Sequence, residues 1–216
     1  TLGKNAWSQS ADGIALGTDS HARLADAISI GRSSQAADTE SIAIGFDSQT
    51  GIGGPQAVAV GKNANAGAAQ SIAIGNNSTS SNAQTIAIGN SALSNNFQTV
   101  AIGDGAEATG VGAAALGQYA TASGLYASAW GRTASASADG SVAFGQQAVV
   151  GFSKAGAVAM GRQVEAVDND TTHVRALYIV APDGGTGGNG ITMLSPDGTA
   201  YKLTIANGGT LTVTAV

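Results

Sequence analysis

Hydrophobic residues recur along this chain in one short phrase: an aliphatic residue, alanine, a second aliphatic residue and glycine. Residues 72–75 (IAIG) and 86–89 (IAIG) are two identical copies, and Leu2-Gly3 is the end of another. The closing glycines are 14 residues apart, except for two intervals of 16. A fixed short period predicts a repeat architecture. The glycines are Gly17, Gly31, Gly45, Gly61, Gly75, Gly89, Gly103, Gly117, Gly131, Gly145 and Gly161.

A second, weaker pattern follows each of these glycines. Small residues occupy the third position in almost every copy and dominate the fifth, as Ser20 and Ala22 do after Gly17. The residues between are mostly Gly, Asn, Asp and Ser, which favour turns. Fourteen residues hold two short strands and two turns. Stacked coils of this kind form an all-β parallel β-roll that rises about 4.8 Å per coil, and this chain has room for about a dozen.

The alternation divides the long strand of each coil into two faces. In residues 72–74 the two isoleucines share one face and Ala73 takes the other. Alanine and serine suffice to fill a thin coil, so the aliphatic residues would point outward as a continuous stripe. Such a stripe requires a partner, most simply further copies of the chain. The rival arrangement, with the aliphatic residues inside, stays open. The predicted interface residues are Ile44, Val60, Ile74, Ile88, Ile102, Trp130 and Phe144.

The repeats are predicted to end at Ala166, which divides the chain into a roll (1–166) and a β-rich C-terminal tip (167–216). In the tip, residues 173–181 are predicted to form a strand and 183–190 (DGGTGGNG) a loop. Three further strands are expected at 191–194, 201–205 and 211–215. The sequence Ser195-Pro196-Asp197-Gly198 is typical of a type I turn.

Composition excludes several functional classes. The net charge is −5, which disfavours nucleic acid as a partner. Cysteine is absent and the two histidines are far apart, so we expect no metal and no cofactor. A metal held by three copies of His173 on a symmetry axis is a minor alternative. No apolar run approaches the roughly 20 residues of a membrane-spanning helix. The acidic residues are scattered, so we expect no enzymatic activity.

Candidate receptor contacts lie where the pattern is interrupted or ends. The longer coils contain extra residues around 51–56 and 151–156, and such insertions map to surface loops. Aromatic residues outside the aliphatic ladder suit contacts with sugars or proteins. These secondary candidates are Phe46, Phe97, Tyr119, Tyr126 and Phe152. The primary candidates lie in the C-terminal tip: Gly184, Thr186, Asn189, Asp197 and Tyr201.

The repeats SIAIGNNSTS, TIAIGNSALS and SVAFGQQAVV resemble the head repeats of trimeric autotransporter adhesins over about residues 1–166. That resemblance implies a left-handed parallel β-roll, a homotrimer and binding to host surfaces. The ending SPDGTAYKLTIANGGTLTVTAV resembles the C-terminal ends of bacteriophage and contractile-tail fibres.

Together the two resemblances predict a non-catalytic, extracellular trimeric fibre tip. As a tail fibre it would attach to a bacterial surface glycan or outer-membrane protein. The alternative is the head of a bacterial adhesin that binds host extracellular matrix or cells. A glycan-depolymerising tail spike is a third and less favoured function.

Overall fold

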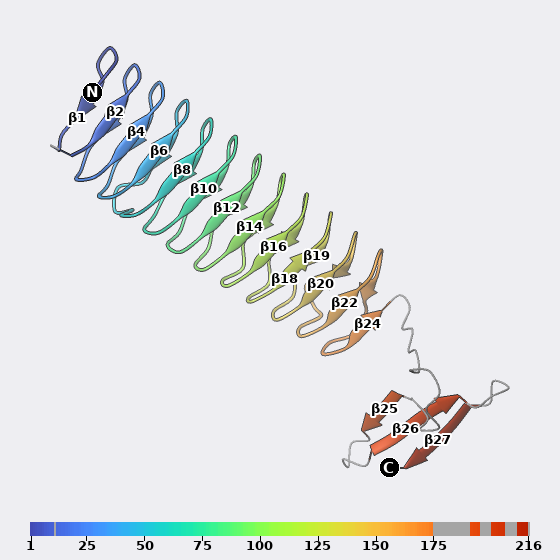
Figure 1. Cartoon of the computed structure of the whole chain (residues 1–216). Helices are drawn as coiled ribbons and strands as arrows, with labels where there is room; N and C mark the ends of the chain where they lie inside the picture. Colours follow the sequence, from blue (N-terminus) through green and yellow to red (C-terminus); the bar gives the residue numbers. More distant parts are fainter. Residues whose placement is uncertain (11, 175–190, 195–199, 206–210, 216) are drawn as a thin grey trace, which may run out of the picture. The chain divides into compact units, whose positions relative to one another are not determined.

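The computed structural model describes residues 1–10, 12–174, 191–194, 200–205 and 211–215. The chain divides into two compact units, Thr1–Arg175 and Ala176–Val216. Each unit is described by itself. The first is a β-roll built from stacked coils, and the second contains one small sheet (Figure 1).

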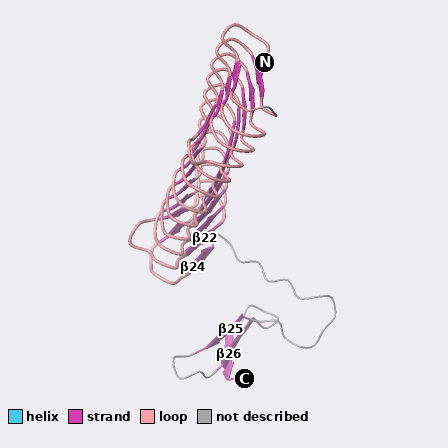
Figure 2. Cartoon of the chain, turned by 90° about the vertical axis from the view of Figure 1, so that its left-hand side faces the viewer, coloured by secondary structure: helices cyan, strands magenta, loops and turns pink. Residues whose placement is uncertain are grey.

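Each coil of the roll contributes a three-residue strand to one parallel sheet and a two-residue strand to a second parallel sheet (Figure 2). Both sheets have twelve strands, as the repeat count predicts. The even-strand sheet comprises β2 (Ile14–Leu16), β4 (Ile28–Ile30), β6 (Ile42–Ile44), β8 (Val58–Val60), β10 (Ile72–Ile74), β12 (Ile86–Ile88), β14 (Val100–Ile102), β16 (Ala114–Leu116), β18 (Ser128–Trp130), β20 (Val142–Phe144), β22 (Val158–Met160) and β24 (Thr172–Val174). The odd-strand sheet comprises β1 (Trp7–Ser8), β3 (His21–Ala22), β5 (Gln35–Ala36), β7 (Gln49–Thr50), β9 (Asn65–Ala66), β11 (Thr79–Ser80), β13 (Leu93–Ser94), β15 (Glu107–Ala108), β17 (Thr121–Ala122), β19 (Ser135–Ala136), β21 (Val149–Val150) and β23 (Glu165–Ala166).

The register of the sheets follows the sequence period. Ile72 pairs with Ile86 and Ala73 with Ala87, so like residues lie directly above one another. The longer coils keep this register, since Ile44 pairs with Val60 across an interval of 16. Their two extra residues are therefore accommodated in the turn before β8, and the ladder is uninterrupted.

The repeat glycine forms the corner at the end of each even strand. Gly89 has φ +139°, a region that residues with a side chain rarely adopt. A Cβ added there would lie within 2.5 Å of the carbonyl carbon of Gly103, the corner of the next coil. Stacked corners thus approach too closely for any side chain, which explains why glycine recurs at the period.

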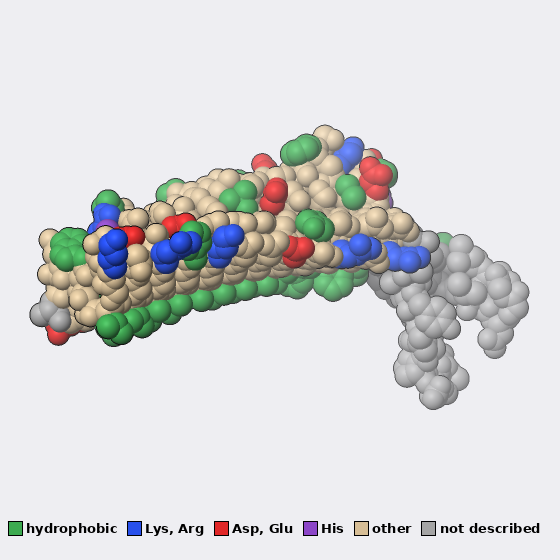
Figure 3. Space-filling view, turned by 90° about the horizontal axis from the view of Figure 1, so that it is seen from above, with side chains coloured by type: hydrophobic (Ala, Val, Ile, Leu, Met, Phe, Trp, Pro, Cys, Tyr) green, Lys and Arg blue, Asp and Glu red, His purple; other side chains and the backbone are tan. Residues whose placement is uncertain are grey.

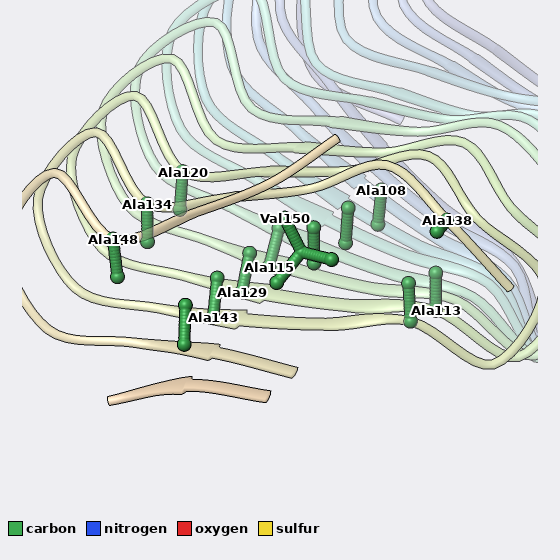
Figure 4. Close-up of a cluster of buried hydrophobic side chains, with 14 of the residues drawn as sticks. Ala108, Ala113, Ala115, Ala120, Ala129, Ala134, Ala138, Ala143, Ala148 and Val150 are labelled. Carbon is green, nitrogen blue, oxygen red and sulfur yellow. The ribbon is translucent and has the colours of Figure 1, made fainter. Parts of the chain in front are cut away.

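Small side chains fill the whole interior between the two sheets. The central residue of every even strand except β24 is buried, and it is alanine in all of these but β4, which has Ser29; the second residue of almost every odd strand is buried too (Figure 4). Val150 is the largest fully buried side chain among the described residues. Buried serines satisfy their hydroxyl groups locally: Ser80 Oγ donates to the carbonyl of Thr85 at 3.0 Å. No buried side-chain polar atom of the described residues lacks a partner. The arrangement with alanine inside is confirmed.

The turns lie along two opposite edges of the roll (Figure 1). We call the turns that follow the even strands the first ridge, and the turns that lead from odd strands back to even strands the second ridge. Both ridges contain residues in the left-handed region, for example Asn77 on the first and Gln84 on the second. Side chains along each ridge bond to their equivalents in the next coil: Asn63 Nδ2 donates to Asn77 Oδ1 at 2.9 Å.

The C-terminal unit contains a three-stranded antiparallel sheet with the order β25 (Ile191–Leu194), β26 (Ala200–Ile205) and β27 (Leu211–Ala215). In the register, Leu203 pairs with both Ile191 and Val213. These three strands lie where the sequence predicted them. The predicted loop at 183–190 and turn at 195–198 lie outside the described residues.

The predicted boundary after Ala166 is wrong by one strand. β24 (Thr172–Val174) pairs in parallel with β22 and completes the even-strand sheet, so the roll extends through it. The sequence places residues 172–174 in the tip because the polar run 168–172 interrupts the aliphatic–alanine phrase. The backbone nevertheless keeps the coil geometry, with His173 opposite Ala159 at an interior position.

Candidate functional site: the apolar face of the roll

The outer face of the even-strand sheet carries an unbroken double ladder of mostly apolar side chains. The first and third residues of each strand point outward, and they are half-buried or exposed in the single chain. Ile74 is 38% exposed, Trp130 47% and Phe144 49%. Trp130 and Phe144 also contact each other, with ring centroids 6.1 Å apart. Because parallel pairing stacks equivalent residues, these side chains form one continuous strip along the roll.

The outer face of the odd-strand sheet is different. Its outward residue in each strand is polar in most coils, for example Gln49, Asn65 and Thr79. The two sheets share the same interior of alanine and serine, so the contrast is confined to their outer faces. The folding of a single chain does not require aliphatic residues on one outer face and polar residues on the other.

A space-filling view shows this contrast directly. One row of hydrophobic side chains runs along most of one side of the roll, while the remaining visible surface is mostly backbone and other side chains, with scattered charged and hydrophobic residues (Figure 3). Apolar strips of this extent on soluble proteins mark surfaces that become covered. The strip is regular and runs through nearly every coil, which suits a partner of the same length and the same repeat.

The seven predicted interface residues all lie on this strip. Trp130, Phe144, Ile74 and Ile102 are exposed, and the other three are half-buried. Their outward position is therefore confirmed. Their role as an interface and the copy number of the assembly stay predictions.

Three of the secondary receptor candidates make contacts that stabilise the roll itself. Phe46 lies under Arg32 of the preceding coil, whose guanidinium carbon is 4.4 Å from the ring centroid. Tyr119 and Tyr126 both have φ +55°, a conformation that costs energy for a tyrosine. Their rings lie over the glycines of the previous coil: a Cβ added to Gly105 would be 2.6 Å from Tyr119 Cε1. Their proposed receptor role is untested.

The other two secondary candidates are among the most exposed hydrophobic side chains of the described residues. Phe97 is 56% exposed, and Phe152, in the second insertion, is 81% exposed. The first insertion presents Ile52 in the equivalent position, 82% exposed. Both insertions therefore form surface turns with an apolar residue at the tip, as the spacing predicted. Sequence reasoning named Phe152 but missed Ile52, although a Gly-aliphatic or Gly-aromatic pair opens each insertion.

The primary receptor candidates are not brought together by the described structure. Gly184, Thr186, Asn189 and Asp197 lie outside the described residues. Tyr201 lies in β26, where it pairs with Met193 and Ala215. Their role stays a prediction.

On the first ridge, amide side chains of neighbouring coils hydrogen-bond to the carboxyl group of Asp104 and shift its pKa. Asn90 Nδ2 donates to Asp104 Oδ1 at 2.8 Å, and Gln118 Nε2 donates to Asp104 Oδ2 at 3.2 Å. These hydrogen bonds hold the pKa of Asp104 below its ordinary value, and the one from Asn90 has the largest effect. Asp104 thereby joins the turns of three consecutive coils.

We expect these hydrogen bonds to make stability depend on pH in the acid range. A depressed folded-state pKa contributes stability above the unfolded-state value of about 3.9, and that contribution is lost as the pH falls through the folded-state pKa. The thermal midpoint of Asp104→Asn should therefore fall less steeply than that of the parent below about pH 4. Scanning calorimetry from pH 6 to pH 2 checks this. Parallel curves for the two proteins would contradict it.

The described residues offer no constellation for metal binding: no group of three or more His, Cys, Asp or Glu side chains is close enough to hold an ion. His173 lies at an interior position of β24, half-buried, with Nε2 2.7 Å from Thr171 Oγ1. It is therefore on the opposite face of the strand from the apolar strip, and the alternative of a metal held by three copies of His173 stays untested. No helix in the described part of the chain is long and apolar enough to cross a membrane.

Comparison with known proteins gives one family. The family model described as the YadA head domain repeat matches residues 25–48, 53–78, 66–92, 94–120 and 122–148, which together are more than half of the chain. A solved structure, the collagen-binding domain of the Yersinia adhesin YadA, aligns with 19% identity. That alignment covers 89% of this chain and 83% of the other, with a TM-score of 0.29. No curated protein sequence matches the chain.

Proposed function

Because the chain belongs to the YadA head domain repeat family, we propose that it is the homotrimeric head of a bacterial surface adhesin. It is non-catalytic, lies outside the cell and attaches to host extracellular matrix or host cell surfaces. Three chains associate through the apolar outer face of the even-strand sheet. The single observation that carries this proposal is the contrast between the two outer faces of the roll.

The apolar face supports the assembly on energetic grounds. Burying an aliphatic side chain of this size stabilises by about 1.5–3 kcal/mol when it is fully exposed beforehand, and proportionally less when it is half-buried. Twelve coils contribute to one face, so many small contributions to the free energy of association add along the roll. A discrete ligand would cover only part of this strip. A parallel copy of the chain covers all of it.

The polar outer face of the odd-strand sheet is the surface that such a trimer leaves to the solvent. It is presented in three identical copies, so weak individual contacts gain effective concentration. Outward side chains there, such as Asn65 and Thr79, are spaced by one coil, about 4.8 Å. A repetitive, extended host-matrix protein is a suitable partner for a face with regular spacing.

The family match favours the adhesin alternative over the tail-fibre function. The matched segments end at residue 148 and include none of the C-terminal unit. The resemblance of residues 195–216 to tail-fibre ends stays a prediction, as does attachment to a bacterial glycan or outer-membrane protein.

Binding assays on immobilised ligands test the function. We expect the purified chain to bind at least one extracellular matrix protein and to leave purified bacterial polysaccharide unbound and uncleaved. Dissociating the trimer should weaken matrix binding by more than tenfold, because avidity of linked sites is worth 10²–10⁴-fold. Surface plasmon resonance on a panel of matrix proteins measures both effects. Binding to polysaccharide alone would favour the tail-fibre function, and released oligosaccharides would indicate a depolymerase.

A further inference from the structure

Charge is distributed unequally between the two ridges of the roll. Among the described residues, the first ridge carries five cations and three carboxylates, whereas the second carries two cations and seven carboxylates. The first-ridge cations are Lys4, Arg32, Lys62, Arg132 and Arg162. The second-ridge carboxylates are Asp12, Asp26, Asp38, Glu40, Asp139, Asp168 and Asp170.

Four of the five first-ridge cations share a coil with second-ridge carboxylates, whereas the coil of Lys62 has none. Arg32 shares its coil with Asp38 and Glu40, and Arg132 shares its coil with Asp139. Lys4 and Asp12 are matched in the same way, as are Arg162 with Asp168 and Asp170. The second coil is mixed, with Asp19 on the first ridge and both Arg23 and Asp26 on the second. Two coils also have apolar residues on both ridges: Phe46 with Ile52, and Tyr119 with Leu125.

For Lys4 and Arg132, this matching makes no ion pair within the described part of a single chain. The first and second ridges lie on opposite edges of both sheets, because every strand runs from one to the other (Figure 1). Within the described part of the chain, Lys4, Lys62 and Arg132 form no ion pair. The carboxylate of Asp139 accepts only a backbone hydrogen bond, from the amide of Leu125 at 2.9 Å.

Rotational symmetry brings the two ridges together between chains. If the apolar faces of several copies surround one symmetry axis, the even strands of every copy run in the same direction around that axis. The first ridge of each copy then meets the second ridge of the next, which is a heterologous, ring-closing interface. Symmetry also places equal coils of the copies at equal heights along the axis. Like-numbered coils are therefore neighbours across the interface.

We propose that the first ridge of each chain docks on the second ridge of the neighbouring chain, with ion pairs between like-numbered coils that fix the parallel register of the assembly. The inference rests on the assembly proposed above and specifies which edges of neighbouring chains meet. A shift by one coil supports the register, because in either direction it leaves only one attractive pair, a cation opposite Asp26 and beside Arg23. With Arg32 opposite Asp26, the shift also places Arg162 opposite Lys154 and Asp47 opposite Asp38. With Lys4 opposite Asp26, it places Arg132 opposite Lys154 and Asp19 opposite Asp38.

The assignment also gives a role to some of the aromatic residues on the ridges. Tyr119 on one chain would face Leu125 and Tyr126 on the next, and Phe46 would face the tip residue Ile52. Exposed ion pairs contribute mainly to specificity and register, while the apolar face contributes most of the affinity. The ridges thus select the parallel, in-register arrangement among the ways in which apolar strips could pair.

Disulfide trapping tests the proposal, because the chain has no cysteine of its own. Arg132→Cys combined with Asp139→Cys should form covalent trimers on oxidation, seen on a non-reducing gel. Arg32→Cys with Asp38→Cys is a second, independent pair. The Cα atoms must approach within about 7 Å for the bond to form. The matched controls are each single variant and the mismatched pair Arg132→Cys with Asp38→Cys, all of which should give no covalent trimer.

The outcomes separate this inference from the proposed function. Light scattering that shows a trimer, together with gels that show no covalent trimer for either matched pair, would overturn the ridge pairing alone. Covalent dimers from the single variants would show that each ridge meets its own equivalent, which also overturns it. A monomeric parent protein would overturn both the ridge pairing and the trimer.

Discussion

Replacing Ile74 and Ile88 together by aspartate is expected to convert the assembly into monomers of 20.9 kDa. The two residues are neighbours in the even-strand sheet, and both point outward from the roll. In a trimer, the double variant would place six carboxylates on the covered face. Burial of a charge costs several kcal/mol even after relaxation, which exceeds what each isoleucine contributes. Multi-angle light scattering at micromolar concentration measures the mass.

The same two coils provide the control. Thr79 and Leu93 are also neighbours one coil apart, but in the odd-strand sheet and on its outer face. Thr79→Asp with Leu93→Asp adds the same charge and should leave the trimer intact. Circular dichroism should show β-structure in both variants. Dissociation of the control variant as well would mean that the odd-strand sheet, too, is covered in the assembly.

Gly89→Ala adds a single methyl group and is expected to destabilise the roll far more than Gly151→Ala does. The corner conformation at φ +139° costs a residue with a side chain about 1–3 kcal/mol. The new Cβ would in addition overlap the backbone of Gly103, which belongs to the next coil and cannot rotate away. Since every coil pairs with two neighbours, a displaced corner weakens both interfaces. Urea denaturation at one fixed chain concentration measures the loss.

Gly151→Ala is the matched control for that variant. Gly151 lies in the second insertion, its φ is not positive, and a Cβ added there would meet no atom within 4 Å. We expect its free energy of unfolding to lie within about 0.5 kcal/mol of the parent. Equal losses for the two alanine variants would show that the corner geometry is not the reason for glycine at the period.

The coil and its contents follow from the sequence alone, because a period of 14 and an alternation of 2 leave few arrangements. The glycine at position 89 predicts a corner, and alternation places Ala87 on the opposite face from Ile86 and Ile88; both are confirmed. The direction of Ile86 and Ile88 could not be decided, since alternation defines two faces and does not say which is inside. The structure decides it by size: stacked coils leave room between the sheets only for Ala, Ser, Thr and an occasional Val.

Two other features were beyond sequence reasoning for physical reasons. The end of the roll was placed before β24 because the polar run 168–172 interrupts the phrase, yet backbone pairing with β22 depends little on side-chain identity. The charge matching between ridges was visible in the sequence as Arg32 with Asp38 and Arg132 with Asp139. Its meaning required the edges to be placed on opposite sides of the roll. Residues that are close in sequence but on opposite edges of the roll then become candidates for contact between chains.

The mass of the unmodified chain in solution tests the central claim most directly. Size-exclusion chromatography with multi-angle light scattering, at physiological salt and at concentrations from 1 to 50 μM (roughly the range in which specific interfaces associate), gives that mass. We predict a single species of three times the 20.9 kDa chain mass over the whole range. A mass of 20.9 kDa at every concentration would contradict the account, because the apolar face would then be exposed in the functional protein.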